Sequence, residues 1–108
     1  MARTDKEITI TQLVAVGSSV ESLDLTNASA GADVEIEVIV ATVGTSVTLR
    51  AEYSNDDFTS SIYGASETFT ADGTYVLPSG KGYKAVRLEL VAEVGGTVTV
   101  DGTLKTIY

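Results

Sequence analysis

The sequence predicts an all-β protein, a single antiparallel β-sandwich that is jelly-roll-like and has about eight strands. Apolar residues recur at every second position in several stretches, most clearly at Val34, Ile36, Val38 and Val40. Such alternation is typical of strands that bury one face. Glycine-rich or polar breaks separate these stretches at intervals of about ten residues, as in sandwich proteins. No stretch of the 108 residues shows a sustained helical period.

The first four strands are predicted from alternation. They are residues 8–16, with Ile8 and Ile10 on one face and Thr9 and Thr11 on the other; residues 21–26, with Leu23 and Leu25 inward; residues 34–43; and residues 47–53, with Val47, Leu49, Ala51 and Tyr53 inward. The Gly44-Thr45 turn predicts that the third and fourth strands pair as a hairpin. In that hairpin Arg50 shares the outer face with Glu35 and Glu37 and can pair with one of them.

The last four strands are predicted between turn signals. They are residues 61–70, after a polar loop at residues 54–60; residues 74–77, which Pro78 ends; residues 83–94; and residues 97–108, after the Gly95-Gly96 turn. Proline ends the sixth strand because it has no N–H to donate to a ladder. Gly102 predicts a bulge or a bend in the last strand. Residues 1–7 are predicted to form a flexible N-terminal arm, and residues 8–108 the β-sandwich domain.

The charge balance bears on the choice of partners. The chain carries 7 basic and 15 acidic residues, for a net charge of −8. That field repels phosphate backbones and anionic lipid headgroups, so we expect no nucleic-acid partner and no membrane partner. The lack of cysteine excludes disulfides and thiolate metal sites. The apolar stretches fall far short of the roughly 20 residues that a membrane-spanning helix needs.

The side-chain inventory argues against an enzyme. The chain has no His, Cys or Trp, which excludes a Ser-His-Asp triad, a cysteine nucleophile and a histidine-based metal site. Paired carboxylates can hydrolyse glycosides, but 108 residues with two Phe and five Tyr give little material for an aromatic-lined cleft. We therefore expect a non-enzymatic protein with no catalytic residues, no cofactor and no bound metal.

Two loops each have a functional and a structural interpretation. Residues 54–57 (Ser-Asn-Asp-Asp) form the densest oxygen cluster, which is a candidate calcium site. Because the spaced ligand pattern of a calcium loop is missing, we favour a polar loop whose side chains bond their own backbone. Residues 80–82 (Gly-Lys-Gly) suggest a phosphate-binding loop. That motif needs a helix after it, and a strand is predicted there, so we interpret the run as a strand connection.

The aromatic residues also allow two interpretations. Tyr53, Tyr63, Tyr75 and Tyr83 could form a platform on which sugars stack. Aromatic residues in strands more often pack in the core or at a sandwich edge, and we favour that interpretation. An exposed, coplanar pair of tyrosines would distinguish the two.

Several strings in the chain resemble small β-sandwich structural proteins of tailed bacteriophages. These strings are Val47-Thr48-Leu49 with Tyr53-Ser54-Asn55-Asp56; Phe69-Thr70-Ala71 with Gly73-Thr74-Tyr75 and Leu77-Pro78; Gly82-Tyr83-Lys84 with Val86-Arg87-Leu88; and Gly95-Gly96-Thr97-Val98-Thr99-Val100. The resemblance covers roughly residues 34–100. Proteins of this group stud assembled capsids as head decoration or accessory proteins, often as trimers.

The resemblance implies a capsid decoration or cement protein that binds the lattice of the major capsid protein. Such a protein lies on the capsid surface of the virion, is assembled in the host cytoplasm and associates with itself as a homotrimer. The residues that we expect at the shell or at another partner are Arg3, Thr4, Asp5, Lys6, Phe58 and Ile62. The first four belong to the predicted arm, which can add to the sheet edge of a neighbour. Phe58 and Ile62 flank the polar loop.

Two other functions remain open. One is a tail or fibre accessory module of the same sandwich type, and the other is a carbohydrate-binding β-sandwich module. The order of residues 54–56 and 86–88 is also similar to that in discoidin-type carbohydrate- or lipid-binding domains. The chain lacks the Trp expected after the first of these strings and the usual disulfide, which argues against ligand binding of that type.

Overall fold

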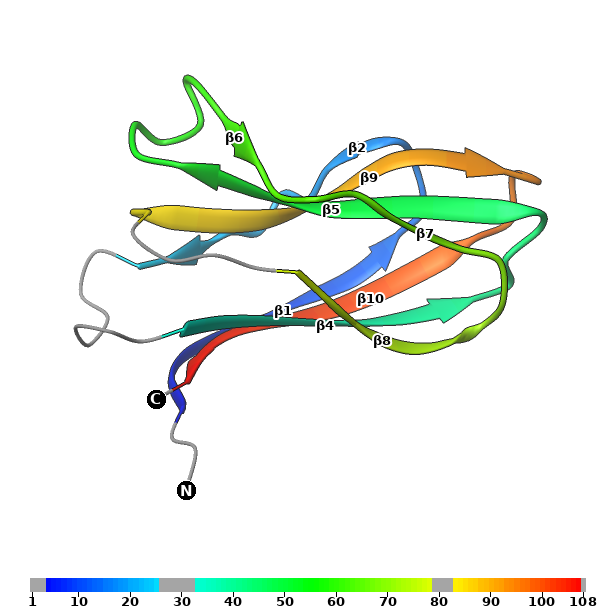
Figure 1. Ribbon diagram of the computed structural model, residues 1–108, viewed down its shortest axis with the longest axis horizontal. Coiled ribbons are helices and arrows are strands. Elements are labelled where there is room, and N and C mark those ends of the chain that lie inside the picture. The colour runs from blue at the N-terminus through cyan, green and yellow to red at the C-terminus, as the bar shows by residue number, and fades with distance from the viewer. Residues whose placement is uncertain (1–3, 26–32, 79–82, 108) are drawn as a thin grey trace.

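The computed structural model describes residues 4–25, 33–78 and 83–107, and these form two antiparallel sheets packed face to face (Figure 1). The predicted all-β sandwich is therefore confirmed. The strands are β1 (Thr4–Leu13), β2 (Gly17–Ser18), β3 (Leu23–Asp24), β4 (Asp33–Ala41), β5 (Ser46–Ser54), β6 (Ile62–Tyr63), β7 (Glu67–Phe69), β8 (Gly73–Leu77), β9 (Ala85–Val94) and β10 (Thr99–Ile107). In these described parts no helix is long and apolar enough to span a membrane.

The two sheets contain strands from the whole length of the chain. The first sheet has the order β1-β10-β4-β8, and the second has the order β2-β9-β5-β6, with β3 also on β9 and β7 also on β5. The chain thus alternates between the sheets, crossing after β1, β3, β4, β7, β8 and β9. This alternation is compatible with the predicted jelly-roll connection, which stays a prediction. The described residues form ten strands, where about eight were predicted.

The core lies between the two sheets and is made by the alternating apolar residues. The first sheet contributes Ile10, Val34, Ile36, Val38, Val40, Leu77, Val100 and Leu104, and the second contributes Leu23, Val47, Leu49, Ala51, Tyr53, Val86, Leu88 and Leu90. All of these side chains are buried. Because each buried aliphatic side chain contributes about 1.5–3 kcal/mol relative to an exposed one, this layer dominates the stability of the fold.

The predicted hairpin of the third and fourth strands is wrong. β4 pairs with β10 and β8 in the first sheet, whereas β5 pairs with β9, β6 and β7 in the second. The chain crosses between the sheets after β4, so the two apolar faces meet across the core instead of lying side by side. Arg50 consequently forms its ion pair with Glu89, and Glu35 forms one with Lys105 at 3.3 Å.

Two such crossings touch at one end of the sandwich. The β4–β5 connection and the β9–β10 connection approach so closely that a Cβ on Gly44 would lie 2.6 Å from the Cα of Gly95. The backbone N–H of Thr45 also donates a hydrogen bond to the carbonyl of Val94 at 2.7 Å. Gly95 has a φ of 118°, a conformation that only glycine adopts readily. Both glycines are therefore required by the contact between the crossings.

The first strand starts earlier than the sequence predicted. β1 begins at Thr4, and the register pairs Thr4 with Ile107 and Glu7 with Lys105 on β10. Residues 4–7, which were assigned to the arm, are thus part of the sheet, and only residues 1–3 of the predicted arm lie outside the described residues. The strand ends at Leu13 rather than at residue 16.

The predicted bulge at Gly102 lies instead on the neighbouring strand. β10 keeps an unbroken register with β4, and β1 carries two irregularities, one between Thr4 and Glu7 and the other between Ile10 and Leu13. Gln12 is the residue with a positive φ there, 55°, and its N–H donates to Asp101 Oδ1 at 2.7 Å. Gly102 has a different function: a Cβ there would lie 3.2 Å from Leu88 Cδ2, so glycine makes room for the opposite sheet.

The contact between the two crossings can be tested with Gly44→Ala. We expect a loss of about 2 kcal/mol in the free energy of unfolding, because the added methyl group overlaps the backbone of Gly95. Urea denaturation measures this loss. Gly64→Ala is the matched control, since its Cβ would meet Ala51 Cβ at an ordinary 3.4 Å. Equal stability of the two variants would show that the crossings do not need their close contact.

Candidate functional site

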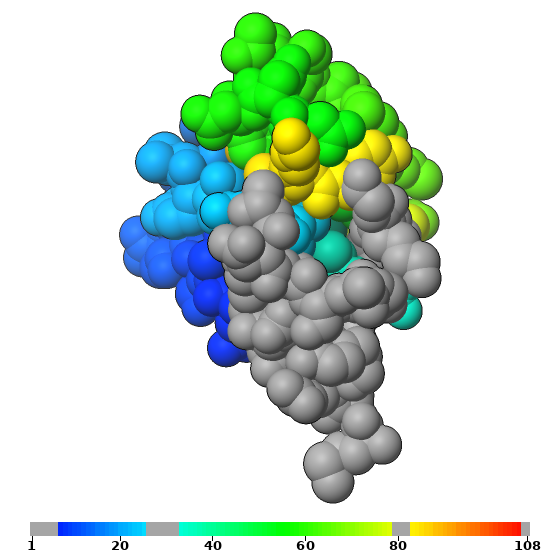
Figure 2. All heavy atoms as spheres, turned by 90° about the vertical axis from the view of Figure 1, so that its left-hand side faces the viewer, coloured from blue at the N-terminus to red at the C-terminus, as the bar shows by residue number. Residues whose placement is uncertain are grey.

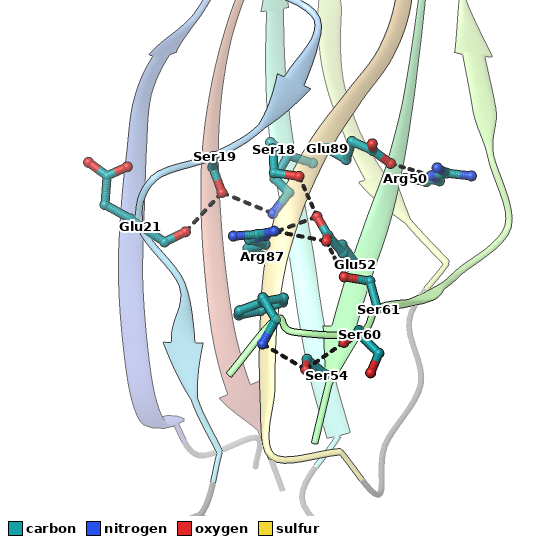
Figure 3. A network of polar contacts seen from close by, with 12 residues as sticks. Ser18, Ser19, Glu21, Arg50, Glu52, Ser54, Ser60, Ser61, Arg87 and Glu89 are labelled. Atoms are coloured by element: carbon teal, nitrogen blue, oxygen red, sulfur yellow. Dashed lines mark hydrogen bonds and ion pairs between the residues drawn. The ribbon is translucent and has the colours of Figure 1, made fainter. Parts of the chain in front are cut away.

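A buried carboxylate occupies the centre of the outer face of the second sheet (Figure 3). Glu52 on β5 is 2% exposed. Arg87 on β9 donates to it with two nearly parallel hydrogen bonds, Nε to Oε1 and Nη2 to Oε2, both 2.9 Å long. The hydroxyls of Ser18 on β2 and of Ser61, just before β6, donate to the same two oxygens. We call these four residues the Glu52 network.

The network follows from the register of the sheet. Glu52 and Arg87 are direct partners across the β5–β9 ladder, so their side chains lie on the same face. Ser18 and Ser61 reach Glu52 from the two flanking strands of the sheet. Burial works to raise the pKa of Glu52, but the hydrogen bonds from Arg87, Ser18 and Ser61 outweigh it and lower that pKa to about 2. The carboxylate is therefore ionised at neutral pH, and both of its oxygens accept hydrogen bonds.

The two arginines of this face are each held between a carboxylate and an aromatic ring. Arg50 pairs with Glu89, and its guanidinium lies 3.7 Å from the ring centroid of Tyr63. The guanidinium of Arg87 lies 3.9 Å from the ring centroid of Phe58. Such contacts contribute about 0.5–1 kcal/mol each at partly exposed positions. Both guanidinium groups therefore make contacts within the second sheet and with the loop that covers it.

The loop at residues 54–61 has the self-bonded structure that the sequence analysis favoured. The Ser54 hydroxyl oxygen accepts the backbone N–H of Asp56 and of Phe58, at 3.1 and 2.9 Å. The Asp56 carboxylate accepts the Ser60 hydroxyl at 2.6 Å and the Ser60 N–H at 2.9 Å. The Ser60 hydroxyl, the Ser60 N–H and Ser54 together lower the pKa of Asp56 to about 2. The carboxylate thus holds the loop together.

The loop contains two consecutive residues in the left-handed region, which explains its dense bonding. Asp57 has a φ of 58° and Phe58 a φ of 63°. A bulky residue such as phenylalanine adopts this conformation only when neighbouring contacts hold it. The hydrogen bond from its N–H to Ser54 and the stacking of its ring on Arg87 provide them. Throughout the described residues, no group of three or more acidic side chains is placed to hold a metal ion.

A shallow groove lies at the end of the sandwich that Figure 2 shows, where residues 20–25, the 54–61 loop and the start of β9 meet. It has a volume of about 300 Å³ and is lined by Ser22, Asp24, Asn55, Asp57, Lys84 and Ala85. Asn55 Oδ1 accepts the backbone N–H of Lys84 at 3.0 Å and so joins the loop to β9. All the polar lining residues are exposed. The groove is therefore hydrated and does not provide the desolvation with which catalytic groups are tuned.

The tyrosines do not form a platform in the described structure. Tyr53 stacks on Tyr83 with ring centroids 4.6 Å apart, and Tyr53 is buried. Tyr75 instead stacks on Phe69, at 4.1 Å. Tyr63 is exposed, but Arg50 lies over its ring. Among the described residues no two exposed tyrosines are stacked side by side, so the packing interpretation fits these rings.

The residues predicted to contact a partner are not brought together. Arg3 lies outside the described residues, and residues 4–6 lie on β1 at one edge of the first sheet. Residues 80–82, which were interpreted as a strand connection, also lie outside the described residues. Ile62, 46% exposed, lies on β6 at the opposite edge of the second sheet. Phe58 is half-buried against Arg87 rather than fully exposed. These positions do not form one surface.

The sequence analysis missed a more exposed apolar segment. Val14, Val16 and Val20 are all exposed, and Val20 is 95% exposed. They lie on residues 14–20, which we call the crossing segment because it runs from β1 in the first sheet, through β2, towards β3 in the second. The available signal was the length of the uncharged run from Leu13 to Val20, which is longer than one buried strand face requires.

The chain matches no protein-family model, and a search of curated protein sequences gives no match.

The Glu52 network can be tested with Arg87→Met, using Arg50→Met as the control. Both variants lose an ion pair and a cation–π contact, but only Arg87→Met leaves a carboxylate that is 2% exposed without its cation. We expect losses of about 3 kcal/mol and of less than about 1 kcal/mol, respectively, in urea denaturation. Combining Arg87→Met with Glu52→Gln should recover part of the loss. Equal effects of the two single variants would contradict the special position of Glu52.

The same network predicts how stability depends on pH. Glu52 has a pKa of about 2 in the folded chain against an ordinary 4.5, so between these values the unfolded chain binds more protons. Stability is therefore fully present above about pH 4.5 and is lost as the pH falls towards about 2. Asp56 acts in the same direction. Urea midpoints measured across this range should fall less steeply for Glu52→Gln than for the natural chain, and parallel curves would refute the assignment.

Proposed function

We propose that this chain is a non-enzymatic structural protein of a tailed-phage virion, a capsid decoration or cement protein that binds the assembled shell. The resemblance of residues 34–100 to small phage β-sandwich proteins supports the virion and its major capsid protein as the setting. The observation that carries the binding function is the exposed crossing segment, with Val14, Val16 and Val20. A run of exposed apolar side chains is a feature of surfaces that bind another protein.

The character of the remaining surface also supports a binding role. The residues best placed for chemistry, Glu52, Arg87 and Asp56, are bonded to other groups of the chain. A rigid body that keeps its charged groups in internal contacts suits a protein that serves as a passive part of a shell. Many weak contacts, repeated over a lattice, then provide the overall attachment.

Carbohydrate binding is the less favoured alternative. Stacking of a sugar needs an open aromatic face, and the described tyrosines pack on each other, on Phe69 or under Arg50. A tail or fibre module would use the same kind of apolar surface, so the partner that is bound distinguishes it from a capsid protein.

Co-sedimentation with assembled shells of the phage that encodes the chain tests the proposal. We expect the natural chain to pellet with shells, and Val16→Asp/Val20→Asp to remain in the supernatant because each charge must lose its hydration in an apolar contact. Val76→Asp is the control, since Val76 is 62% exposed, close to the 63% of Val16, and lies on β8 at the far edge of the first sheet. Retention of the chain on a glycan matrix, with no binding to shells, would favour the sugar-binding module instead.

A further inference from the structure

One edge of the sandwich is built differently from the other three. The strands at the ends of the two sheets are β1 and β8 in the first and β2 and β6 in the second. β2 and β6 have two residues each and β8 has five, whereas β1 has ten. Very short edge strands are a common protection against pairing with another chain. β1 is the longest of these edge strands, and two irregularities of its register with β10 leave residues 7–10 as its regular stretch.

The middle of β1 lacks two other protections, charge and proline. Residues 8–11 (Ile-Thr-Ile-Thr) contain neither, and residues 7–10 keep a regular register with β10 between two irregularities, one between Thr4 and Glu7 and the other between Ile10 and Leu13. Among the described elements, β1 pairs with β10 and with no other strand. Beside its C-terminal half lies a groove of about 320 Å³ between residues 10–13 and residues 18–21. This half of the edge therefore faces an open groove.

We propose that β1 pairs with β1 of a second copy of this chain, antiparallel and around a two-fold axis at Thr9. A two-fold interface must be complementary to itself, so residues equally spaced about the axis face one another. Around Thr9, this places Ile8 opposite Ile10 of the second copy, Thr9 opposite its counterpart, and Glu7 opposite Thr11. The isoleucine and threonine pairs join like with like, Glu7 meets an uncharged residue, and no two equal charges are opposed.

The position of the two-fold axis at Thr9 follows from a comparison with the neighbouring positions along β1. An antiparallel pairing must keep residues that face the core opposite residues that face the core. The two-fold axis must therefore pass through a residue of β1, because an axis between two residues would pair core-facing residues with outward-facing ones. An axis at Ile8 would place Lys6 opposite the buried Ile10, and an axis at Ile10 would place Ile8 opposite Gln12. Either choice opposes an apolar side chain and a polar one. Thr9 is thus the centre that continues the apolar layer across the interface.

The charge of the chain determines when this pairing occurs. Two copies at −8 each repel one another at low ionic strength. Salt screens this repulsion, so the dimer should strengthen as the sodium chloride concentration rises from about 0.02 M to about 0.5 M. A two-fold dimer is also a different state from the homotrimer that the phage resemblance implies. The inference does not depend on the proposed function.

A single cysteine tests the axis directly, because the chain has none of its own. In Thr9→Cys the two thiols would face each other across the axis, within reach of a disulfide. Thr103→Cys is the control: Thr103 is the partner of Thr9 on β10, one strand further in. Two such thiols would be separated by three strand spacings, about 14 Å. In a glutathione redox buffer at high salt we expect a disulfide-linked dimer from Thr9→Cys alone.

A charge exchange provides an independent test. Thr9→Glu places two carboxylates opposite each other and next to Glu7 of the other copy, so we expect the dimer to weaken by about tenfold or more in sedimentation velocity. Thr74→Glu adds the same charge at an exposed position of β8, at the far edge of the first sheet, and should keep the dimer. Mixing Thr9→Glu with Thr9→Lys should restore association as a heterodimer. Urea denaturation of each variant confirms that the monomer is folded.

Three results would overturn the proposal. The first is equal cross-linking of Thr9→Cys and Thr103→Cys. The second is a natural chain that remains a monomer at high salt or forms a trimer. The third is a mixture of Thr9→Glu and Thr9→Lys that associates no better than Thr9→Glu alone.

Discussion

The close contact of Gly44 with Gly95 is the constraint on which the arrangement of both sheets depends. β4 pairs with β10 in one sheet and β5 pairs with β9 in the other, so the β4–β5 and β9–β10 connections must cross the sandwich at the same end. The two crossings lie against each other, and side chains at the point of contact would force them apart. Their approach lets four long strands present their apolar faces to a single core.

The Glu52 network stabilises the two short strands at the edges of the second sheet. β2 and β6 are only two residues long, so ladder hydrogen bonds alone hold them weakly at the edges of the second sheet. Glu52 sits on the central strand β5 and receives a hydroxyl from each side, through Ser18 and Ser61. Burying a charge is costly unless it is paired, and Arg87 supplies the pairing. We interpret the network as a polar tie that fixes the short edge segments in one position.

The sequence was sufficient for the class of fold and for most of the inward-facing residues, because a period of two identifies which face of a strand is buried. It was not sufficient for strand neighbours, since a glycine turn between two strands is compatible with a hairpin or with a crossing. The turn at Gly44 was interpreted as a hairpin for that reason. The burial of Glu52 was equally inaccessible, because the alternation places it on an outer face and the groups that cover it come from Ser18, Ser61 and Arg87.

The distribution of edge protection connects the fold to how the chain meets other molecules. β2 and β6 are two residues long and are tied to Glu52 through Ser18 and Ser61, and β8 has five residues, so these edges offer less backbone than β1 for a second chain to pair with. Along residues 7–10, between the two irregularities of β1, what opposes association is the net charge of −8. A charge barrier differs from a steric one because ionic strength or a nearby basic surface lowers it without any change in structure. The proposed β1 pairing is therefore one that ionic conditions control: repulsion keeps the copies apart at low ionic strength, and screening lets the edges meet.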